Sequence, residues 1–205
     1  MTFEQGRRTD AGVIVAVVAV VLGACGPHRS AQPSPPAVPI GVGQSFHPSP
    51  LSAAARDGIA IGRLRCARLL AARFGVHVEV FADRRAVIVP AGIGIAPPQR
   101  RAGAYVSGGR CSYPARTVEP TGVIEVRSGR SLTLRDLFAI WGQPLSRRRV
   151  AAFSATPGSQ VRAFVDGRPW RRDPGAIPLR RHAEVVLEIG GLVPPHSAYR
   201  FAPGL

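Results

Sequence analysis

The sequence predicts an α+β domain dominated by strands, in which a β-grasp-like sheet packs on one short helix and another helix lies near the N-terminal end of the domain. Three observations support this fold class. Residues 76–81 alternate between apolar and polar side chains, as a half-buried strand does. Residues 133–142 carry the start and stop signals of a helix. Strand-like runs at 160–170 and 183–189 follow that helix, and such a mixture is typical of α+β domains.

The first 24 residues have the features of a signal peptide. Arg7 and Arg8 precede an uncharged apolar run at 11–22 (AGVIVAVVAVVL). A run of this length is too short to cross a bilayer core of ~30 Å, but it is typical of a signal peptide. It ends in Leu-Gly-Ala-Cys, which resembles the lipobox of bacterial lipoproteins. We therefore expect cleavage before Cys25, lipidation of its thiol and attachment to the extracytoplasmic face of the cell membrane. The alternatives are an ordinary secretory peptide and a twin-arginine signal at Arg7 and Arg8.

The rest of the chain divides into a tether and one domain. Residues 25–53 are rich in proline, serine and glycine and have no periodic apolar face, so they are predicted to be a disordered tether. His28 and His47 lie in it and are interpreted as linker residues. Residues 54–205 have the usual length of a single domain and are long enough to bury a core.

The first elements of that domain are a helix and a hairpin. Residues 59–74 (IAIGRLRCARLLAARF) place apolar side chains at helical spacing, which predicts a helix. VHVEVF at 76–81 has its three valines on one face of a strand. Residues 83–84 are predicted to form a tight turn into a second strand at 86–89.

The later elements include the short helix on which the sheet is expected to pack. PAGIGIAPP at 90–98 has the glycines of a phosphate-binding loop, but its two prolines exclude the helix that such a loop needs. GVIEVR at 122–127 predicts a strand. Thr133 and Asp136 form a capping box before an apolar-faced helix that Gly142 ends. The remaining predicted strands are 160–165 and 168–170, joined by a turn at 166–167, and 183–189.

The positive charge of the chain is carried by arginine alone. The chain has 27 arginines, no lysine and a formal net charge of +15. A charge of this size attracts polyanions, and for an exported protein these would be anionic lipid head groups or acidic wall polymers and not nucleic acid. The alternative is a solvated arginine surface. The arginines proposed to contact a polyanion are Arg84, Arg85, Arg147, Arg148, Arg149, Arg171 and Arg172.

Two cysteines remain beside the expected lipid attachment site. Outside the cytoplasm, a pair such as Cys66 and Cys111 usually oxidises, so we expect a disulfide between them. In the chain-entropy model, a loop of 45 residues gives a stabilisation of about 4 kcal/mol. The alternative is a nucleophilic Cys111, which lacks a neighbouring base to activate its thiol.

The domain resembles a family of bacterial secreted and lipoprotein domains. The matching pieces, in order, are Cys66, the strand that ends in VEVF at 78–81, VPAGIGI at 89–95, Cys111 with Tyr113, Thr117, GVI at 122–124, TLRDLFAIWGQPLS at 133–146, AFVDG at 163–167, IPLRRH at 177–182 and FAPGL at 201–205. The resemblance implies the fold and the location more than an activity.

The resemblance also implies a histidine cluster that could hold a metal ion, and this chain departs from it. On the first strand only His77 matches, because Arg73 and Gly75 stand at the two other histidine positions. After Cys111, arginine and valine replace histidines at 116 and 118, and Glu119 replaces an aspartate. Glu125 stands at a further histidine position. The weak metal candidates that remain are His77, Glu119, Glu125 and His182.

Three classes of function stay open. We expect a non-enzymatic envelope or interaction domain without a cofactor, because no catalytic set is recognisable. The alternatives are a metal-binding or metal-handling lipoprotein with a degenerate site, and a hydrolase that uses two of its glutamates as acid and base. Convergence of three or more residues of one set would favour these alternatives. That set is His77, Glu79, Glu119, Glu125 and His182.

Overall fold

The computed structural model describes residues 51–68, 71–194 and 199–205. The expected signal peptide, Cys25 and nearly all of the expected tether lie outside the described residues. The helices are α1 (Ala53–Asp57), α2 (Leu134–Trp141) and the 3₁₀ helix η1 (Pro174–Ala176). The strands are β1 (Arg73–Ala82), β2 (Arg85–Ala86), β3 (Arg100–Ala102), β4 (Tyr105–Gly108), β5 (Ala115–Arg116), β6 (Val123–Arg127), β7 (Leu145–Ser146), β8 (Arg149–Val150), β9 (Phe153–Ser154), β10 (Arg162–Val165), β11 (Arg168–Trp170) and β12 (Glu184–Ile189).

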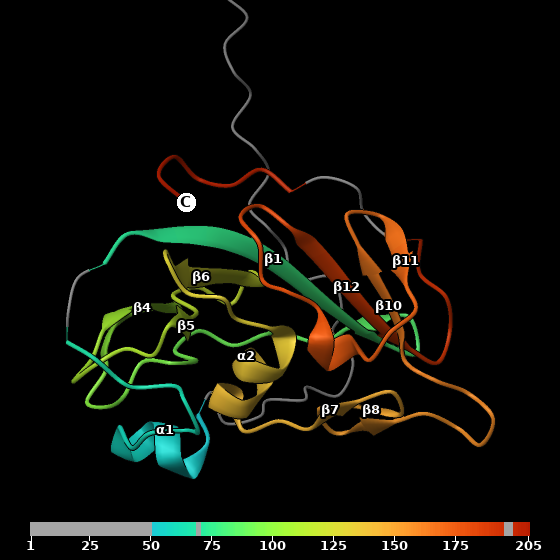
Figure 1. Ribbon diagram of the computed structural model, residues 1–205, viewed down its shortest axis with the longest axis horizontal. Helices are drawn as coiled ribbons and strands as arrows, with labels where there is room; N and C mark the ends of the chain where they lie inside the picture. Colours follow the sequence, from blue (N-terminus) through green and yellow to red (C-terminus); the bar gives the residue numbers. More distant parts are fainter. Residues whose placement is uncertain (1–50, 69–70, 195–198) are drawn as a thin grey trace, which may run out of the picture. The chain divides into compact units, whose positions relative to one another are not determined.

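The main sheet has the strand order β11-β10-β12-β1-β6-β5 (Figure 1). The short strand β2 pairs with the end of β1. The two central strands of the sheet, β1 and β12, are parallel, and every other pair is antiparallel. In the chain, α2 lies between the antiparallel pair β1–β6 and the antiparallel pair β10–β11. It packs beneath the sheet (Figure 1). This is the β-grasp arrangement, so the predicted strand-dominated α+β fold class is confirmed.

The core forms where the valine face of β1 meets α2. Val76, Val78 and Val80 are buried, as their alternation predicted, and they share one core with Leu137 and Trp141 of α2. Burying each such side chain stabilises the fold by roughly 1.5–3 kcal/mol. The sheet and the helix are therefore held together by the faces that the sequence pattern assigned to the core.

The ends of α2 are fixed by the predicted signals. Oδ2 of Asp136 accepts a hydrogen bond from the amide of Thr133 at 2.8 Å, which is half of the predicted capping box. Gly142 ends the helix with a φ of 77°, a left-handed conformation that glycine adopts without steric cost. The local signals at 133–142 therefore locate this helix correctly.

The helix expected at 59–74 is wrong. The helix of this region, α1, ends before it at Asp57, and Gly58 follows in the left-handed conformation. Ala67 instead exchanges two main-chain hydrogen bonds with Ser112, and Phe74 lies opposite Val126 in the β1–β6 ladder. Contacts between distant parts of the chain thus override the helical spacing, as tertiary packing commonly does.

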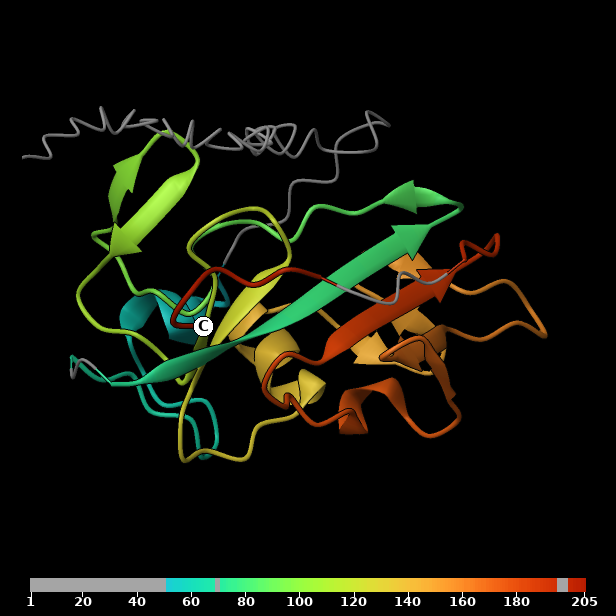
Figure 2. The ribbon, with the colours of Figure 1, turned by 90° about the horizontal axis from the view of Figure 1, so that it is seen from above.

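The predicted hairpins are present, although the first is shorter than expected. Asp83 and Arg84 form its turn, with φ values of 48° and 66° as a two-residue hairpin turn requires. Its second strand, β2, has only two residues, Arg85 and Ala86, and only Ala86 lies in the predicted range of 86–89. The β10–β11 hairpin and the closing strand β12 lie where they were predicted. The β3–β4 hairpin, seen at one end of the molecule in Figure 2, and the small β7-β8-β9 sheet were not predicted.

Candidate functional site

His77, the first metal candidate, is enclosed by other parts of the protein. It lies on β1 with only 5% of its surface exposed. Its Nε2 is 3.1 Å from the main-chain oxygen of Thr121, and its Nδ1 is 3.7 Å from Oε1 of Glu184. Tyr199 stacks on its ring with 4.0 Å between the centroids. Both ring nitrogens and one ring face are therefore engaged by protein groups.

The C-terminal segment also packs against position 75, where the resemblance implied a second histidine. Phe201 lies against Gly75, and a Cβ added at this glycine would be 2.4 Å from the Cδ1 atom of Phe201. His182 stacks on Phe201, and its Nε2 is 2.6 Å from the main-chain oxygen of Leu205. Phe201 thus covers the sheet at Gly75, and any side chain at position 75 would displace the ring of Phe201.

The remaining candidates do not converge. Arg116 binds the carboxylate of Glu125 at 2.7 Å, and Glu119 is exposed. Glu125 lies opposite Gly75 of β1, four residues before Glu79 on that strand, and this separation corresponds to ~13 Å. Within the described ranges, no group of three or more histidine, cysteine, aspartate or glutamate side chains could hold a metal ion.

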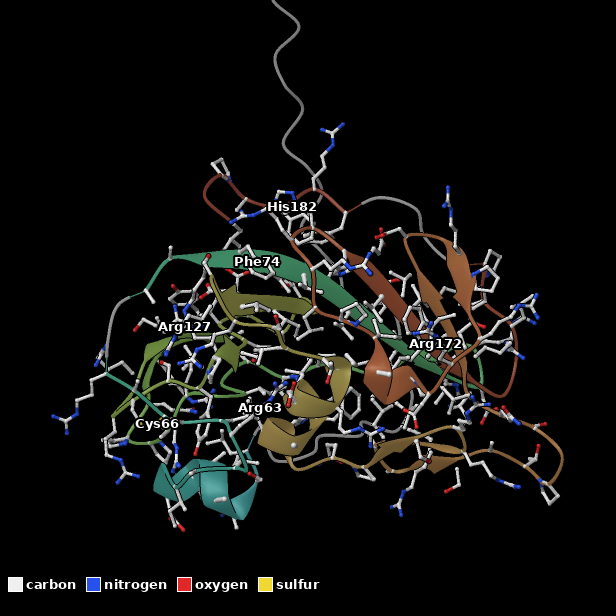
Figure 3. The ribbon with its side chains drawn as sticks, in the orientation of Figure 1. Arg63, Cys66, Phe74, Arg127, Arg172 and His182 are labelled. Carbon is white, nitrogen blue, oxygen red and sulfur yellow. A yellow bond between two sulfur atoms is a disulfide. The ribbon has the colours of Figure 1, made fainter. Side chains whose placement is uncertain are left out.

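The expected disulfide is present. Cys66 and Cys111 are bonded, with their Cα atoms 5.5 Å apart. The bond joins the segment before β1 to the segment between β4 and β5, near α1, where Figure 3 labels Cys66. It confirms the predicted pairing and removes the thiol that a nucleophilic Cys111 would need.

A recess of about 440 Å³ opens beside this disulfide. Five arginines line it, and the other lining residues are alanine, serine, glycine and the bonded Cys111, without a carboxylate or a histidine. The five arginines are Arg68, Arg73, Arg100, Arg110 and Arg116. They come from four separate stretches of the chain, and the disulfide and the β1–β6–β5 ladders bring them together.

Two of these guanidinium groups, those of Arg73 and Arg116, form hydrogen bonds with residues of the main sheet or next to it. Arg73 donates from Nη1 to the main-chain oxygens of Pro114 and Glu125, at 3.3 and 3.4 Å. Arg116 donates from Nε to the carboxylate of Glu125 at 2.7 Å. Two charged donors are therefore fixed at the inner side of the recess.

The electrostatic environment of the recess disfavours further positive charge. Burial, and after it the charge of Arg116, lowers the pKa of Arg73 to about 10, although Glu125 acts in the opposite direction. The protonated guanidinium is therefore less stable here than in water. An anion in the recess would stabilise it, because an opposite charge within a few ångströms favours the charged form.

The other three arginines form the outer part of the lining. Arg110 donates from Nη2 to the main-chain oxygen of Arg56 at 3.3 Å. Arg100 lies over Gly108, where an added Cβ would be 2.4 Å from its Nη2. Arg68 and Arg100 donate no side-chain hydrogen bond and form no ion pair with another residue of the described ranges. Among these residues, the two guanidiniums thus line the recess without a side-chain partner.

Sequence reasoning missed this site. The arginines that it proposed for polyanion contact are exposed as expected, but they lie at the β1–β2 turn, around the β7–β8 turn and after β11, and none lines the recess. Adjacent arginine pairs mark turns, whereas the recess collects arginines that are mostly isolated in the sequence. The one available signal was the expectation, implied by the resemblance, that positions 73 and 116 belong to one site.

No known protein family, no curated protein and no solved structure matches the chain. No helix among residues 51–68, 71–194 and 199–205 is long and apolar enough to cross a membrane. The fold and the site together define a β-grasp-like domain with an arginine-lined recess.

Proposed function

We propose that the chain is a non-enzymatic binding lipoprotein, anchored through Cys25 at the extracytoplasmic face of the membrane, whose recess binds an anionic group of an acidic wall polymer. The observation that carries the proposal is the convergence of five guanidinium groups on one recess that no carboxylate lines. A merely solvated arginine surface would spread these charges apart, because like charges in a confined space destabilise one another.

The chemistry of the lining favours oxyanions. A guanidinium presents its donors in a planar fork that matches phosphate and carboxylate oxygens, and such charge-assisted hydrogen bonds are stronger than neutral ones. The lining offers no histidine, carboxylate or free thiol to act as base, acid or activated nucleophile. Binding without turnover is therefore the function that it supports best.

The expected location limits the possible anions to those found outside the cytoplasm. An exported protein meets acidic wall polymers and anionic lipid head groups, whereas nucleic acid is kept in the cytoplasm. We favour the polymer because the recess is concave and of a size typical of ligand sites, whereas lipid head groups need only a charged surface. The metal-handling alternative is not supported by a ligand cluster among the described residues.

Calorimetric titration of the purified full chain with inorganic pyrophosphate and with a glycerol phosphate polymer tests the proposal. The variant Arg68→Gln/Arg100→Gln removes two guanidiniums of the recess. The matched control is Arg147→Gln/Arg148→Gln, which removes the same charge from an exposed turn. Because each lost charge-assisted hydrogen bond weakens binding by roughly 1.5–3 kcal/mol, we expect the recess variant to bind at least about tenfold more weakly.

The control variant should retain affinity within about twofold when the salt concentration is held constant. Equal losses in both variants would mean that only the overall charge attracts the polymer, and the recess would then not be a site. Tighter binding to anionic vesicles than to the polymer would assign the recess to lipid head groups instead.

A further inference from the structure

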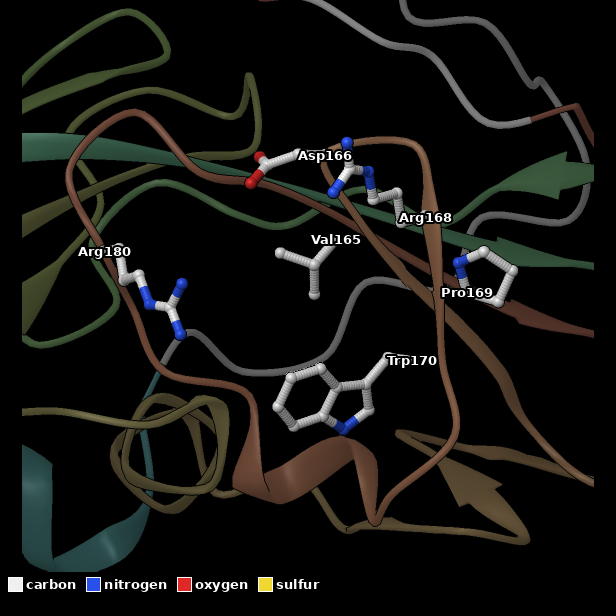
Figure 4. Close-up of a pocket in the computed structure, with 6 residues that line it drawn as sticks. All are labelled: Val165, Asp166, Arg168, Pro169, Trp170 and Arg180. Atoms are coloured by element: carbon white, nitrogen blue, oxygen red, sulfur yellow. The ribbon is translucent and has the colours of Figure 1, made fainter.

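A second recess, of about 450 Å³, lies at the β10–β11 hairpin. It is lined by Val165, Asp166, Arg168, Pro169, Trp170 and Arg180 (Figure 4). The strand order places β11 at one edge of the main sheet and β5, which carries Arg116, at the other edge. The two recesses therefore belong to separate sites.

Trp170 gives this recess a flat apolar wall that the first recess lacks. The indole is partly exposed, and its Nε1 donates to the main-chain oxygen of Asp173 at 3.0 Å, which fixes the orientation of the ring. Val165 and Pro169 extend the apolar lining (Figure 4). The other tryptophan, Trp141, is buried in the core with 1% exposure, so Trp170 is the one that a ligand can reach.

The polar part of the recess contains two guanidinium groups. Arg168 and Arg180 extend from opposite walls (Figure 4), and within the described ranges their side chains form no hydrogen bond or ion pair. Asp166 is fixed in the hairpin turn, where its Oδ1 accepts a hydrogen bond from the amide of Glu184 at 2.9 Å. The guanidinium of Arg172 lies over the indole ring of Trp170, 5.8 Å from its centroid, without lining the recess, and adds positive charge there.

We propose that this recess binds a sugar ring that carries a carboxylate, such as a uronic acid residue of an acidic polysaccharide. The C–H face of a pyranose ring is apolar and packs against an aromatic ring, and Trp170 supplies that surface. The carboxylate pairs with Arg168 or Arg180, and a ring hydroxyl donates to Asp166. A neutral sugar leaves both guanidiniums unpaired, and a bare phosphate leaves the apolar wall exposed to water.

The experiment follows the fluorescence of the full chain during titration with a trimer of galacturonic acid, and with the neutral trimer of glucose as reference. The acidic trimer should change the emission of Trp170, and the neutral trimer should not. Trp170→Phe should abolish this change and weaken binding, measured by calorimetry, about tenfold. Arg168→Gln should weaken binding by a similar factor.

Arg171→Gln is the matched control, because it removes the same charge from an exposed neighbour that does not line the recess. It should change affinity by less than about twofold. Equal responses to the two trimers, or equal losses in Arg168→Gln and Arg171→Gln, would overturn the proposal. The variant Arg68→Gln/Arg100→Gln should keep the fluorescence response, so that failure of one recess is distinguishable from failure of the other.

Discussion

At the scale of single residues, the buried hydroxyl of Tyr113 joins two segments of the chain. Tyr113 is fully buried, and its hydroxyl donates to the main-chain oxygen of Ile59 and lies 3.3 Å from that of Ala54, which ties the region around α1 to the rest of the fold. Burial raises the pKa of Tyr113 above its usual value of 10.0. The folded state therefore holds the phenol proton more tightly than the unfolded state does.

The raised pKa of Tyr113 predicts a loss of stability at alkaline pH. The contribution of the neutral phenol is fully present below pH 10.0, and it decreases as the pH rises above that value, because the unfolded state then releases the proton more readily. Tyr113→Phe should reduce this pH dependence and lower the free energy of unfolding at pH 7 by about 1 kcal/mol. Urea denaturation between pH 7 and 11 measures both effects. The exposed Tyr105→Phe is the control, and an equal slope in both variants would contradict the prediction.

The carboxylate of Glu125 neutralises part of the positive charge of the arginine-lined recess. Its side chain is 11% exposed and pairs with Arg116, whose side chain is 21% exposed. Glu125→Gln keeps the shape and removes the negative charge. We expect the free energy of unfolding to fall by about 2 kcal/mol because the charge-assisted hydrogen bond is lost. Pyrophosphate should bind more tightly, because the recess becomes more positive.

Urea denaturation and calorimetric titration measure the two effects of Glu125→Gln separately. Glu119→Gln removes the same charge from an exposed position and should change neither quantity appreciably. Weaker binding of pyrophosphate by Glu125→Gln would show that this carboxylate positions Arg116 more than it neutralises it.

At the scale of elements, the sequence predicted those whose signals are local. The capping box and Gly142 locate α2, the alternating valines locate β1, and the Asp166–Gly167 turn locates the β10–β11 hairpin. The β3–β4 hairpin and the β7-β8-β9 sheet were missed because their strands have two to four residues, too few for alternation to be recognised.

The segment before β1 shows why local spacing can mislead. Its apolar residues serve different partners: Leu64 packs in the core and bridges to Ile61, while Cys66 bonds to Cys111. The arginine recess was missed for the same reason, because its members meet only through the sheet and the disulfide. The sequence thus predicted the main elements of the fold, whereas the arginine recess depends on contacts between distant parts of the chain.

The disulfide should be the strongest single constraint on that segment. In the chain-entropy model, the loop of 45 residues corresponds to about 4 kcal/mol. Cys66→Ala/Cys111→Ala should therefore lower the melting temperature by on the order of 10 °C. It should also weaken pyrophosphate binding, because Arg68 and Arg110 flank the two cysteines. Thermal unfolding with and without reductant measures the effect. A variant that melts like the oxidised parent would contradict the prediction.

At the scale of the whole molecule, the proposals combine an anchor with two binding recesses. The net charge of +15 draws acidic polymers toward the domain over a distance set by the salt concentration, about 10 Å at 0.1 M. The recesses at opposite edges of the sheet would then hold the polymer through specific contacts. Two weak sites on one chain raise the overall affinity for a repeating ligand, because the second contact is intramolecular.

This arrangement depends on the expected lipid anchor at Cys25. Lipidation requires the thiol of Cys25, and each buried CH₂ of an attached lipid contributes ~0.8 kcal/mol to membrane binding. Cys25→Ser should therefore release the protein from the membrane fraction or leave its signal peptide uncleaved, and it should abolish labelling by a radioactive fatty acid. Cys66→Ala/Cys111→Ala is the matched control, because it removes the other two cysteines and should keep the label. A fatty acid label that persists in Cys25→Ser would show that the lipid is attached elsewhere and that the protein is not a lipoprotein of this kind.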